Sequence, residues 1–431
     1  MYVEKRPTFQ GRFASGSSGC CETMNWKFST LLLAGALLFC LSKSSFASHS
    51  QNQTLHTDPI NLSPEIRAAH ERFYNLDYDA ALQHFEAVQR ANPQNPMASN
   101  YILMTLVFRE LYHQDLLDTT YYAHDSFLFS KRQISIPKET RDRIEQLTNS
   151  SIALCDQQIR NNPNDANAYF ARGYARGMHA AFTTLADHSW VAAARQGYAS
   201  RNDSEQALRI DPEYADAKMA IGIQQFAVAS LPRFIRIMVG ITGVTGNKEK
   251  GLDFLRQAAA KGVVCNIESR TALSLFLRHD GRYAEALGVQ HGLAQEFPHD
   301  YLFRLEEANL TKDKGNGPTA IATYKRVLDD ASKPGFFTDA RLQMAYFGLA
   351  DTQRGQNLIA DAAENYLNAA AQPKCTEWLR RRAQLNAGQM FDLLHERDKA
   401  VEQYQLASAG GGDQSQADAA RRYLKSPYRG S

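Results

Sequence analysis

The sequence predicts an all-α fold in which antiparallel helix pairs stack one on another as a solenoid. The stretch from Tyr301 to Pro334 reads as two short amphipathic helices separated by Gly315, Asn316 and Gly317. Small residues fall where two such helices would cross, and the same spacing returns along the chain. Because one helix pair cannot bury its own apolar faces, each pair needs a neighbour, and a stack of pairs follows.

The pattern is clearest when Tyr301 is counted as position 1. Ala308 and Ala320 then occupy positions 8 and 20, and Tyr324 occupies position 24. Two antiparallel helices approach closely only where the side chains at their crossing are small, and a large residue fills the gap beside them. Pro318 stands at the start of the second helix, where its missing N–H costs nothing.

These offsets match the helix–turn–helix pattern of the tetratricopeptide repeat (TPR), which the chain resembles from about residue 64 to 425. Position 8 is assigned to Gly173, Gly222, Ser274, Ala308, Gly348 and Gly388. Prolines that end a second helix recur at Pro93, Pro163, Pro212 and Pro298. The resemblance implies a right-handed α-solenoid whose repeats are mostly longer than the ideal 34 residues. Residues 417–424 are predicted to form a helix that caps its C-terminal end.

A short apolar stretch near the N-terminus predicts export. Residues 28–42 carry no charge, follow Lys27, and precede a small-residue cleavage site that ends at Ala47. Fifteen residues are few for a membrane span, so we expect a cleaved signal peptide and a periplasmic or secreted protein. If the stretch stays uncleaved, it would anchor the chain in a membrane, and Met24 is an alternative start.

The expected organisation has four parts and two irregular insertions. These are an N-terminal extension with signal peptide (1–47), a polar linker (48–62), a TPR-like solenoid (63–425) and a C-terminal tail (426–431), with insertions near 114–135 and 231–250. Within the second insertion, the apolar run 234–244 suits either a membrane-surface or partner-docking helix, or an extra helix packed into the solenoid.

Composition and motifs argue against several function classes. A net charge of +2 gives no basic footprint for nucleic acid. Cys155, Cys265 and Cys375 follow the predicted cleavage site, and their wide spacing predicts neither a disulfide framework nor a metal site. We find no HExxH, GxSxG or CxxC motif. The sequence therefore predicts no catalytic residue, no metal and no cofactor.

One region of the sequence keeps an enzymatic alternative open. Asp118, His124 and Asp125 bring ionisable groups into the irregular insertion near 114–135, although their spacing suits a polar loop. Residues 231–307 resemble a group of exported acidobacterial TPR proteins without an assigned activity, and more weakly the eukaryotic inclusion-body-clearance TPR family. We carry no function across either likeness.

The resemblance places positions 2, 5, 9 and 12 of each repeat on a concave groove. The predicted groove residues are Asn167, Phe170, Tyr174, Met219, Ile223, Phe226, Leu302, Leu305, Asn309, Lys312, Leu342, Leu385 and Gln389. Phe170, Met219 and Leu305 stand at position 5, where carboxylate-clamp TPRs place polar side chains, so no such clamp is expected. A mostly apolar groove suits a protein or peptide partner. Alternatively, these residues pack against neighbouring helices or the chain's own segments.

Together these observations predict a non-catalytic, exported scaffold that binds a protein or peptide partner, with no nucleic acid. The alternative is a membrane-associated assembly factor, held by residues 28–42 or by residues 234–244. Self-association into a homo-oligomer is left open by the sequence.

Overall fold

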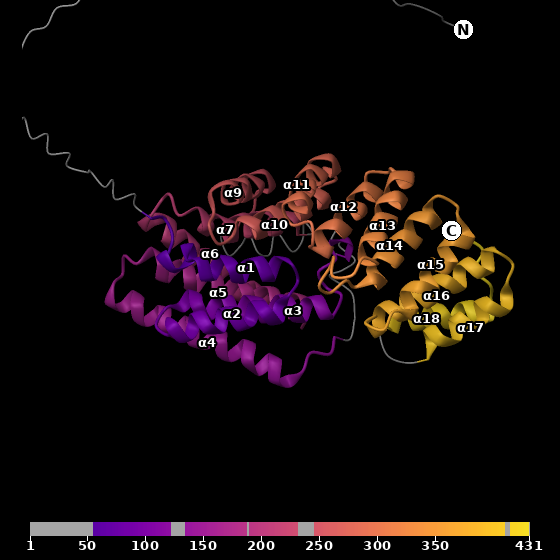
Figure 1. Ribbon diagram of the computed structural model, residues 1–431, viewed down its shortest axis with the longest axis horizontal. Helices are drawn as coiled ribbons and strands as arrows, with labels where there is room; N and C mark the ends of the chain where they lie inside the picture. The colour runs from indigo at the N-terminus through magenta and orange to yellow at the C-terminus, as the bar shows by residue number, and fades with distance from the viewer. Residues whose placement is uncertain (1–54, 122–133, 188, 232–244, 410–413, 431) are drawn as a thin grey trace, which may run out of the picture. The chain divides into compact units, whose positions relative to one another are not determined.

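The computed structural model describes residues 55–121, 134–187, 189–231, 245–409 and 414–430, which lie in one compact unit, Thr54–Ser431. Over these residues the chain forms 17 α-helices and short 3-10 segments, with no β-strand (Figure 1). Each helix packs chiefly against the helices immediately before and after it in the sequence. This arrangement confirms the predicted all-α solenoid of paired helices.

The α-helices of the first part of the chain are α1 (Pro64–Tyr74), α2 (Tyr78–Ala91), α3 (Pro96–His113), α4 (Lys138–Asn161), α5 (Ala166–Leu185), α6 (Trp190–Ile210), α7 (Lys218–Ser230) and α9 (Lys248–Lys261). The remaining α-helices are α10 (Asn266–His279), α11 (Tyr283–Glu296), α12 (Tyr301–Asp313), α13 (Gly317–Ala331), α14 (Leu342–Gly355), α15 (Ile359–Ala371), α16 (Glu377–Leu393), α17 (Arg397–Ser408) and α18 (Gln414–Lys425). Three 3-10 segments are η1 (Pro59–Leu62), η2 (Thr119–Tyr121) and η4 (Ala215–Ala217).

Several helices begin directly after a residue whose side chain caps the helix N-terminus. Asn95, Asp165, Asn247, Asp300 and Asn316 each accept a hydrogen bond from a backbone N–H in the first turn of the helix that follows. Such caps satisfy donors that have no partner inside the helix. The predicted helix-ending prolines lie in the turns just before several of these caps, so the local sequence separates one pair from the next.

Five helix pairs repeat one pattern of burial at positions 8, 20, 24 and 27. The four positions hold Ala69, Ala81, Phe85 and Val88 in α1–α2; Ser274, Ala286, Gln290 and Leu293 in α10–α11; Ala308, Ala320, Tyr324 and Val327 in α12–α13; Ala350, Ala362, Tyr366 and Ala369 in α14–α15; and Gly388, Ala400, Tyr404 and Ala407 in α16–α17. All are buried. A Cβ added at Gly388 would lie 2.6 Å from the ring of Tyr404. The large residue at position 24 therefore fills the space that the small residue leaves.

The structure corrects one predicted position. Position 8 of α14 is Ala350, two residues beyond the predicted Gly348, because Ala350 has the same offset from Ala362 and Tyr366 as in the other pairs. Gly348 faces the preceding pair instead, where a Cβ would come within 2.6 Å of the Tyr324 ring. Glycine is the expected residue at a close crossing, but alanine is small enough here. Leu342, placed at position 2 by the incorrect phase, is the first residue of α14.

The pairs α5–α6 and α7–α9 also meet at glycines. In α5, a Cβ on Gly173 would lie 3.1 Å from the backbone oxygen of Ser200 in α6. In α7, a Cβ on Gly222 would lie 2.9 Å from the backbone oxygen of Gly251 in α9. The backbones of α7 and α9 therefore touch directly at this crossing.

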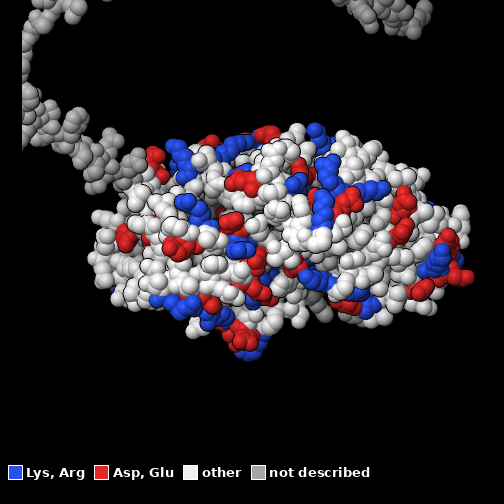
Figure 2. Space-filling model, in the orientation of Figure 1, with Lys and Arg blue, Asp and Glu red and all other residues white. Residues whose placement is uncertain are grey.

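Some predicted features lie outside the described residues. These are the signal-peptide stretch 28–42, the apolar run 234–244, His124 and Asp125. No α-helix in the described part of the chain is both long and apolar enough to span a membrane. On the face drawn in Figure 2, basic and acidic side chains are interspersed.

Both ends of the described chain pack onto the repeats. Of the predicted linker 48–62, the described part includes η1, where the buried Asn61 accepts a hydrogen bond from the Tyr101 hydroxyl of α3 at 2.7 Å. At the other end, α18 buries Ala417 and Ala420, and its Tyr423 ring lies 5.5 Å from Tyr404 of α17. Helix α18 thus covers the last pair, as the predicted cap does.

The turn inside each regular pair places one residue in the left-handed region. The φ angles are 60° at Leu76, 73° at Gly281, 87° at Gly315, 58° at Asn357 and 60° at His395. Glycine adopts this conformation freely, whereas a residue with a Cβ is strained there.

We predict that His395→Val lowers the free energy of unfolding by about 1–2 kcal/mol, because β-branched residues tolerate a positive φ poorly. His395→Gly should keep or slightly raise stability, because relief of strain offsets the greater freedom of the unfolded chain. Urea unfolding followed by circular dichroism measures both variants. Equal effects of valine and glycine would contradict the conformational explanation.

Candidate functional site

The predicted groove residues lie mainly on the first helices of the pairs, and none is exposed. Phe170, Tyr174, Met219, Phe226, Leu305, Asn309, Leu385 and Gln389 are buried, and Asn167, Ile223, Leu302, Lys312 and Leu342 are half-buried. Neighbouring helices cover part of this surface. For example, Phe226 stacks on Phe276 of α10 with ring centroids 4.2 Å apart. Their role as partner contacts stays a prediction.

A distant segment of the same chain covers another part of this surface. Residues 113–120, here called the inserted segment, begin at the last residue of α3 and contact side chains of α10, α12, α14 and α16. Asn309, one of the predicted groove residues, donates a hydrogen bond from Nδ2 to Asp118 of this segment at 3.1 Å. The hydroxyl of Tyr324 in turn donates to Asn309 Oδ1 and fixes the amide's orientation.

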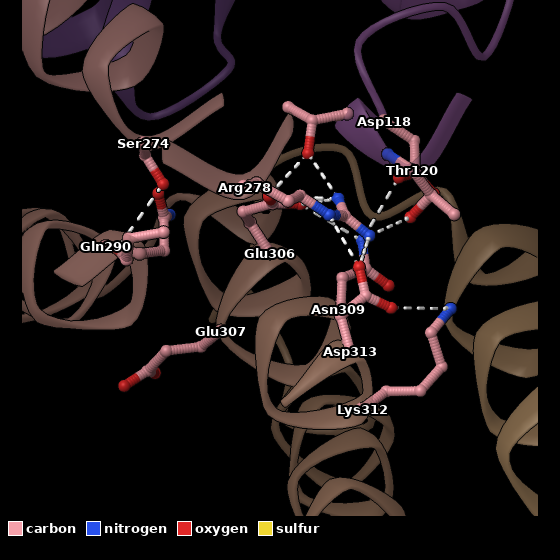
Figure 3. A network of polar contacts seen from close by, with 12 residues as sticks. Asp118, Thr120, Ser274, Arg278, Gln290, Glu306, Glu307, Asn309, Lys312 and Asp313 are labelled. Carbon is pink, nitrogen blue, oxygen red and sulfur yellow. Dashed lines mark hydrogen bonds and ion pairs between the residues drawn. The ribbon is translucent and has the colours of Figure 1, made fainter. Parts of the chain in front are cut away.

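The buried Arg278 of α10 binds the far end of the inserted segment (Figure 3). Its guanidinium donates to the hydroxyl oxygens of Thr119 at 2.5 Å and Thr120 at 3.1 Å. It also pairs with Glu306 Oε1 at 3.1 Å and Asp313 Oδ2 at 2.6 Å, both on α12. The Thr119 hydroxyl donates to Glu306. One buried cation therefore joins two repeat helices to the inserted segment.

The charges in this network are closely matched. Burial raises the pKa of Glu306, while the neighbouring Arg278 opposes that rise. Glu306 Oε2 also accepts from Asn309 at 3.2 Å. Lys312, another predicted groove residue, approaches Asp313 only at 4.0 Å. Carboxylates of α12 already balance the positive charge of Arg278. Arg278 therefore contacts the inserted segment chiefly through hydrogen bonds and not through an unbalanced charge.

A second pocket binds the start of the inserted segment through Asp115. The Asp115 carboxylate accepts from Arg341 Nε at 2.6 Å, Gln343 Nε2 at 2.9 Å and Thr376 Oγ1 at 2.7 Å. The side chain of Asp115 is fully buried and that of Arg341 is 5% exposed. Trp378 of α16 donates its indole N–H to the backbone oxygen of residue 114 at 3.2 Å. The pocket recognises both a carboxylate and the polypeptide backbone.

Further contacts extend this pocket along the segment. Arg341 also donates to the backbone oxygens of His113 at 3.0 Å and Lys374 at 2.6 Å. Asp115 adopts a φ of 56°, which turns the chain from α3 into the inserted segment. Leu116, the next residue, is fully buried. The repeats thus contact backbone, carboxylate, apolar and hydroxyl groups of one short irregular segment.

Sequence reasoning found only part of this site. Asn309 and Lys312 were predicted as groove residues, and Asp118 was weighed as a polar loop residue, whereas Arg278 and Arg341 were missed. Arg278 lies at position 12 of the pair that contains Ser274, so the repeat phase alone could have indicated it. Arg341 lies just before α14 and has no such positional signal.

The described residues include no group of three or more His, Cys, Asp or Glu side chains arranged to hold a metal ion. Cys155, Cys265 and Cys375 are all buried free thiols.

A separate buried contact joins the first pair to the middle of the solenoid. Tyr74, the last residue of α1, donates its hydroxyl to Glu268 Oε1 of α10 at 2.7 Å. Glu268 Oε2 is buried without a hydrogen-bond partner. Burial raises the pKa of Glu268 to about 7, and the bond from Tyr74 only partly opposes it. Burial also raises the pKa of Asp300, the cap of α12, to about 7.

We predict that stability falls as the pH rises from about 4 to 7, because both carboxyl groups have a higher pKa in the folded chain than in the unfolded chain. Their contribution is complete below the unfolded pKa and is lost as the pH passes the folded value. Shifts of this size correspond to at most about 3–4 kcal/mol for each group. Melting temperature measured at several pH values should show the fall. The double variant Glu268→Gln, Asp300→Asn should flatten it, whereas Glu364→Gln on the exposed face of α15 should not.

No protein-family model matches the chain, and no curated protein matches it. Solved structures similar to the chain include yeast Tom70, with a TM-score of 0.41 and 10% identity over 84% of this chain and 87% of that one.

Two further solved structures resemble the chain. A tetratricopeptide repeat protein from Parabacteroides merdae has a TM-score of 0.34 and 14% identity over 75% of this chain and 97% of that one. The human IFIT1 dimer with PPP-AAAA has a TM-score of 0.43 and 14% identity over 84% and 81% of the two chains. The paired helices and their small crossing residues make this chain a TPR-like helical-repeat protein.

Proposed function

We propose that the chain is a non-catalytic scaffold that binds a protein or peptide partner on the concave face of its repeats. One observation supports this most strongly: side chains of four first helices or their N-terminal flanks hold residues 113–120 as they would hold a bound peptide. Backbone oxygens, carboxylates and hydroxyls of this segment all meet donors. A surface that binds one segment of polypeptide in this way can bind a similar segment of a partner.

The half-buried groove residues give a partner its points of contact. Asn167, Ile223, Leu302 and Lys312 keep part of their surface accessible, whereas Phe170 and its buried counterparts support the helices from within. A test of binding should therefore change half-buried residues. Replacing the buried ones would disturb folding and binding together.

The test is capture of crosslinked partners from the native cell, followed by mass spectrometry, with matched charge reversals. Lys312→Glu on α12 should reduce capture severalfold, because it reverses the charge of a half-buried groove residue. Lys325→Glu, on the exposed surface of α13, should not. If both variants capture the partner as well as the unaltered chain does, the predicted groove is not the binding surface.

We further propose that the mature protein is exported, as residues 28–47 indicate. The second candidate is a membrane-associated assembly factor, favoured by the same apolar stretch if it is retained. N-terminal sequencing of the cellular protein separates the two. A mature chain that begins at Ser48 supports export, whereas a membrane-bound chain that retains residues 28–42 supports the anchor.

A further inference from the structure

We infer that the partner presents an acidic, irregular segment to this concave face, and that the inserted segment is its competitor within the same chain. The inference rests on the proposed function and specifies the chemistry of the partner. The required pattern is a carboxylate, an apolar residue, any residue, a second carboxylate and two hydroxyl residues. Residues 115–120, Asp-Leu-Leu-Asp-Thr-Thr, supply this pattern within the chain.

The first carboxylate is the essential one. Arg341 forms its ion pair with Asp115 of the inserted segment, and both side chains are almost completely buried. Gln343 and Thr376 add donors to the same carboxylate and no negative charge. Without an anion, the pocket would keep a buried and uncompensated guanidinium, which costs several kcal/mol. Any segment that replaces the inserted segment must therefore supply a carboxylate here.

The pocket around Arg278 selects hydroxyl groups and a hydrogen-bonded carboxylate. Arg278 is paired with Glu306 and Asp313 of the repeats, so it does not need a further anion. Its remaining hydrogen bonds go to the hydroxyls of Thr119 and Thr120. The neutral amide of Asn309 binds the second carboxylate, that of Asp118. This pocket fixes the register of the segment more than it attracts charge.

The spacing between the pockets sets the direction and length of the ligand. Asp115 lies against the N-terminal flanks of α14 and α16, whereas Thr119 and Thr120 lie against α10 and α12. Four to five residues therefore reach from the flanks of α14 and α16 to α10 and α12, with the buried Leu116 between the anchors. A partner must run in the same direction to satisfy both pockets.

Occupation by the inserted segment weakens binding from outside. The apparent affinity for an external segment falls in proportion to the fraction of chains whose pockets are vacant. A change that weakens the internal segment and leaves the pockets intact should therefore strengthen external binding. Asp115→Asn is such a change, because it removes the charge that pairs with Arg341 and alters no residue of the repeats.

The experiment measures fluorescence anisotropy of a labelled synthetic peptide, YHQDLLDTTY, with the full chain. A control peptide carries Asn at both Asp positions. The Asp115→Asn chain should bind the acidic peptide about tenfold more tightly than the unaltered chain does, and about tenfold more tightly than it binds the control peptide. Adding Arg341→Met should abolish this gain. If Asp115→Asn prevents folding, Thr119→Val with Thr120→Val should give a smaller gain of the same sign.

A folded variant chain that binds neither peptide, with cooperative melting as the test of folding, would overturn the inference. Equal binding of the acidic and control peptides would also overturn it. Competition separates this result from the proposed function. If a captured cellular partner is not displaced by the acidic peptide, the inference fails and the scaffold function stands. If the peptide binds through Arg341 and no partner is captured, the inference stands and the scaffold function fails.

Discussion

Replacing Arg278 by methionine is expected to lower the free energy of unfolding by about 3–5 kcal/mol, the largest effect of any single change considered. The methionine would fill much of the same space. It would also remove the positive charge of Arg278, with which Glu306 forms its ion pair among the described residues. Asp313 would lose its 2.6 Å partner, and both threonines of the inserted segment would lose a donor. Loss of one partner from a buried ion pair leaves the other charge buried and unpaired.

Denaturant unfolding monitored by circular dichroism measures this loss, and Arg282→Met provides the control. Arg282 also pairs with two carboxylates, Glu249 at 2.9 Å and Glu285 at 2.7 Å, but its side chain is 28% exposed, against 1% for Arg278, and both carboxylate side chains are exposed. Exposed pairs contribute little because water and salt screen them. A loss for Arg278→Met no greater than for Arg282→Met would contradict the structural role of the buried network.

The second large effect is expected at the crossing of α7 and α9. Gly222→Val should lower the free energy of unfolding by about 3 kcal/mol or more, because its side chain would meet backbone that cannot move aside. Even a Cβ would lie 2.9 Å from the backbone oxygen of Gly251 and 2.9 Å from the Leu255 side chain. The two helices would have to separate, and that would open the packing around the crossing.

A glycine elsewhere in a helix supplies the matched control. Gly288 lies inside α11, and a Cβ added there meets no atom within 4 Å. Gly288→Ala should therefore raise stability by about 0.5–1 kcal/mol, since alanine is the better helix former. Thermal unfolding of both variants measures these opposite signs. Destabilisation of both by similar amounts would show that close approach of the backbones is not the cause.

The helix pairs could be predicted because their determinants are local. Proline, the capping residues and the small residues of positions 8 and 20 lie within one unit, so periodicity places them directly. The predicted repeat phase of α14 was wrong because Gly348 and Ala350 are both small enough for a helix crossing. Only contacts with the neighbouring pairs decide between them. Local sequence therefore predicted where the helix pairs lie more accurately than which residue occupies each repeat position.

The contacts of the inserted segment could not be predicted, because they join residues that are far apart in the sequence. Thr119 and Arg278 are 159 residues apart, and Asp115 and Thr376 are 261 residues apart. Repeat positions indicate which side chains face the concave side. They do not indicate how far the stack curves, or which segment then reaches it. The Arg341 pocket depends on three separate segments, so no spacing in the sequence could have identified it.

Amide hydrogen–deuterium exchange of residues 113–120 is the most direct test of the account, because it reports whether the repeats hold this segment in solution. We predict slow exchange in the unaltered chain, comparable with that of α12. Arg341→Met should release the segment to fast exchange and leave α17 protected. Exchange of the segment in the unaltered chain as fast as that of the free peptide would contradict the account.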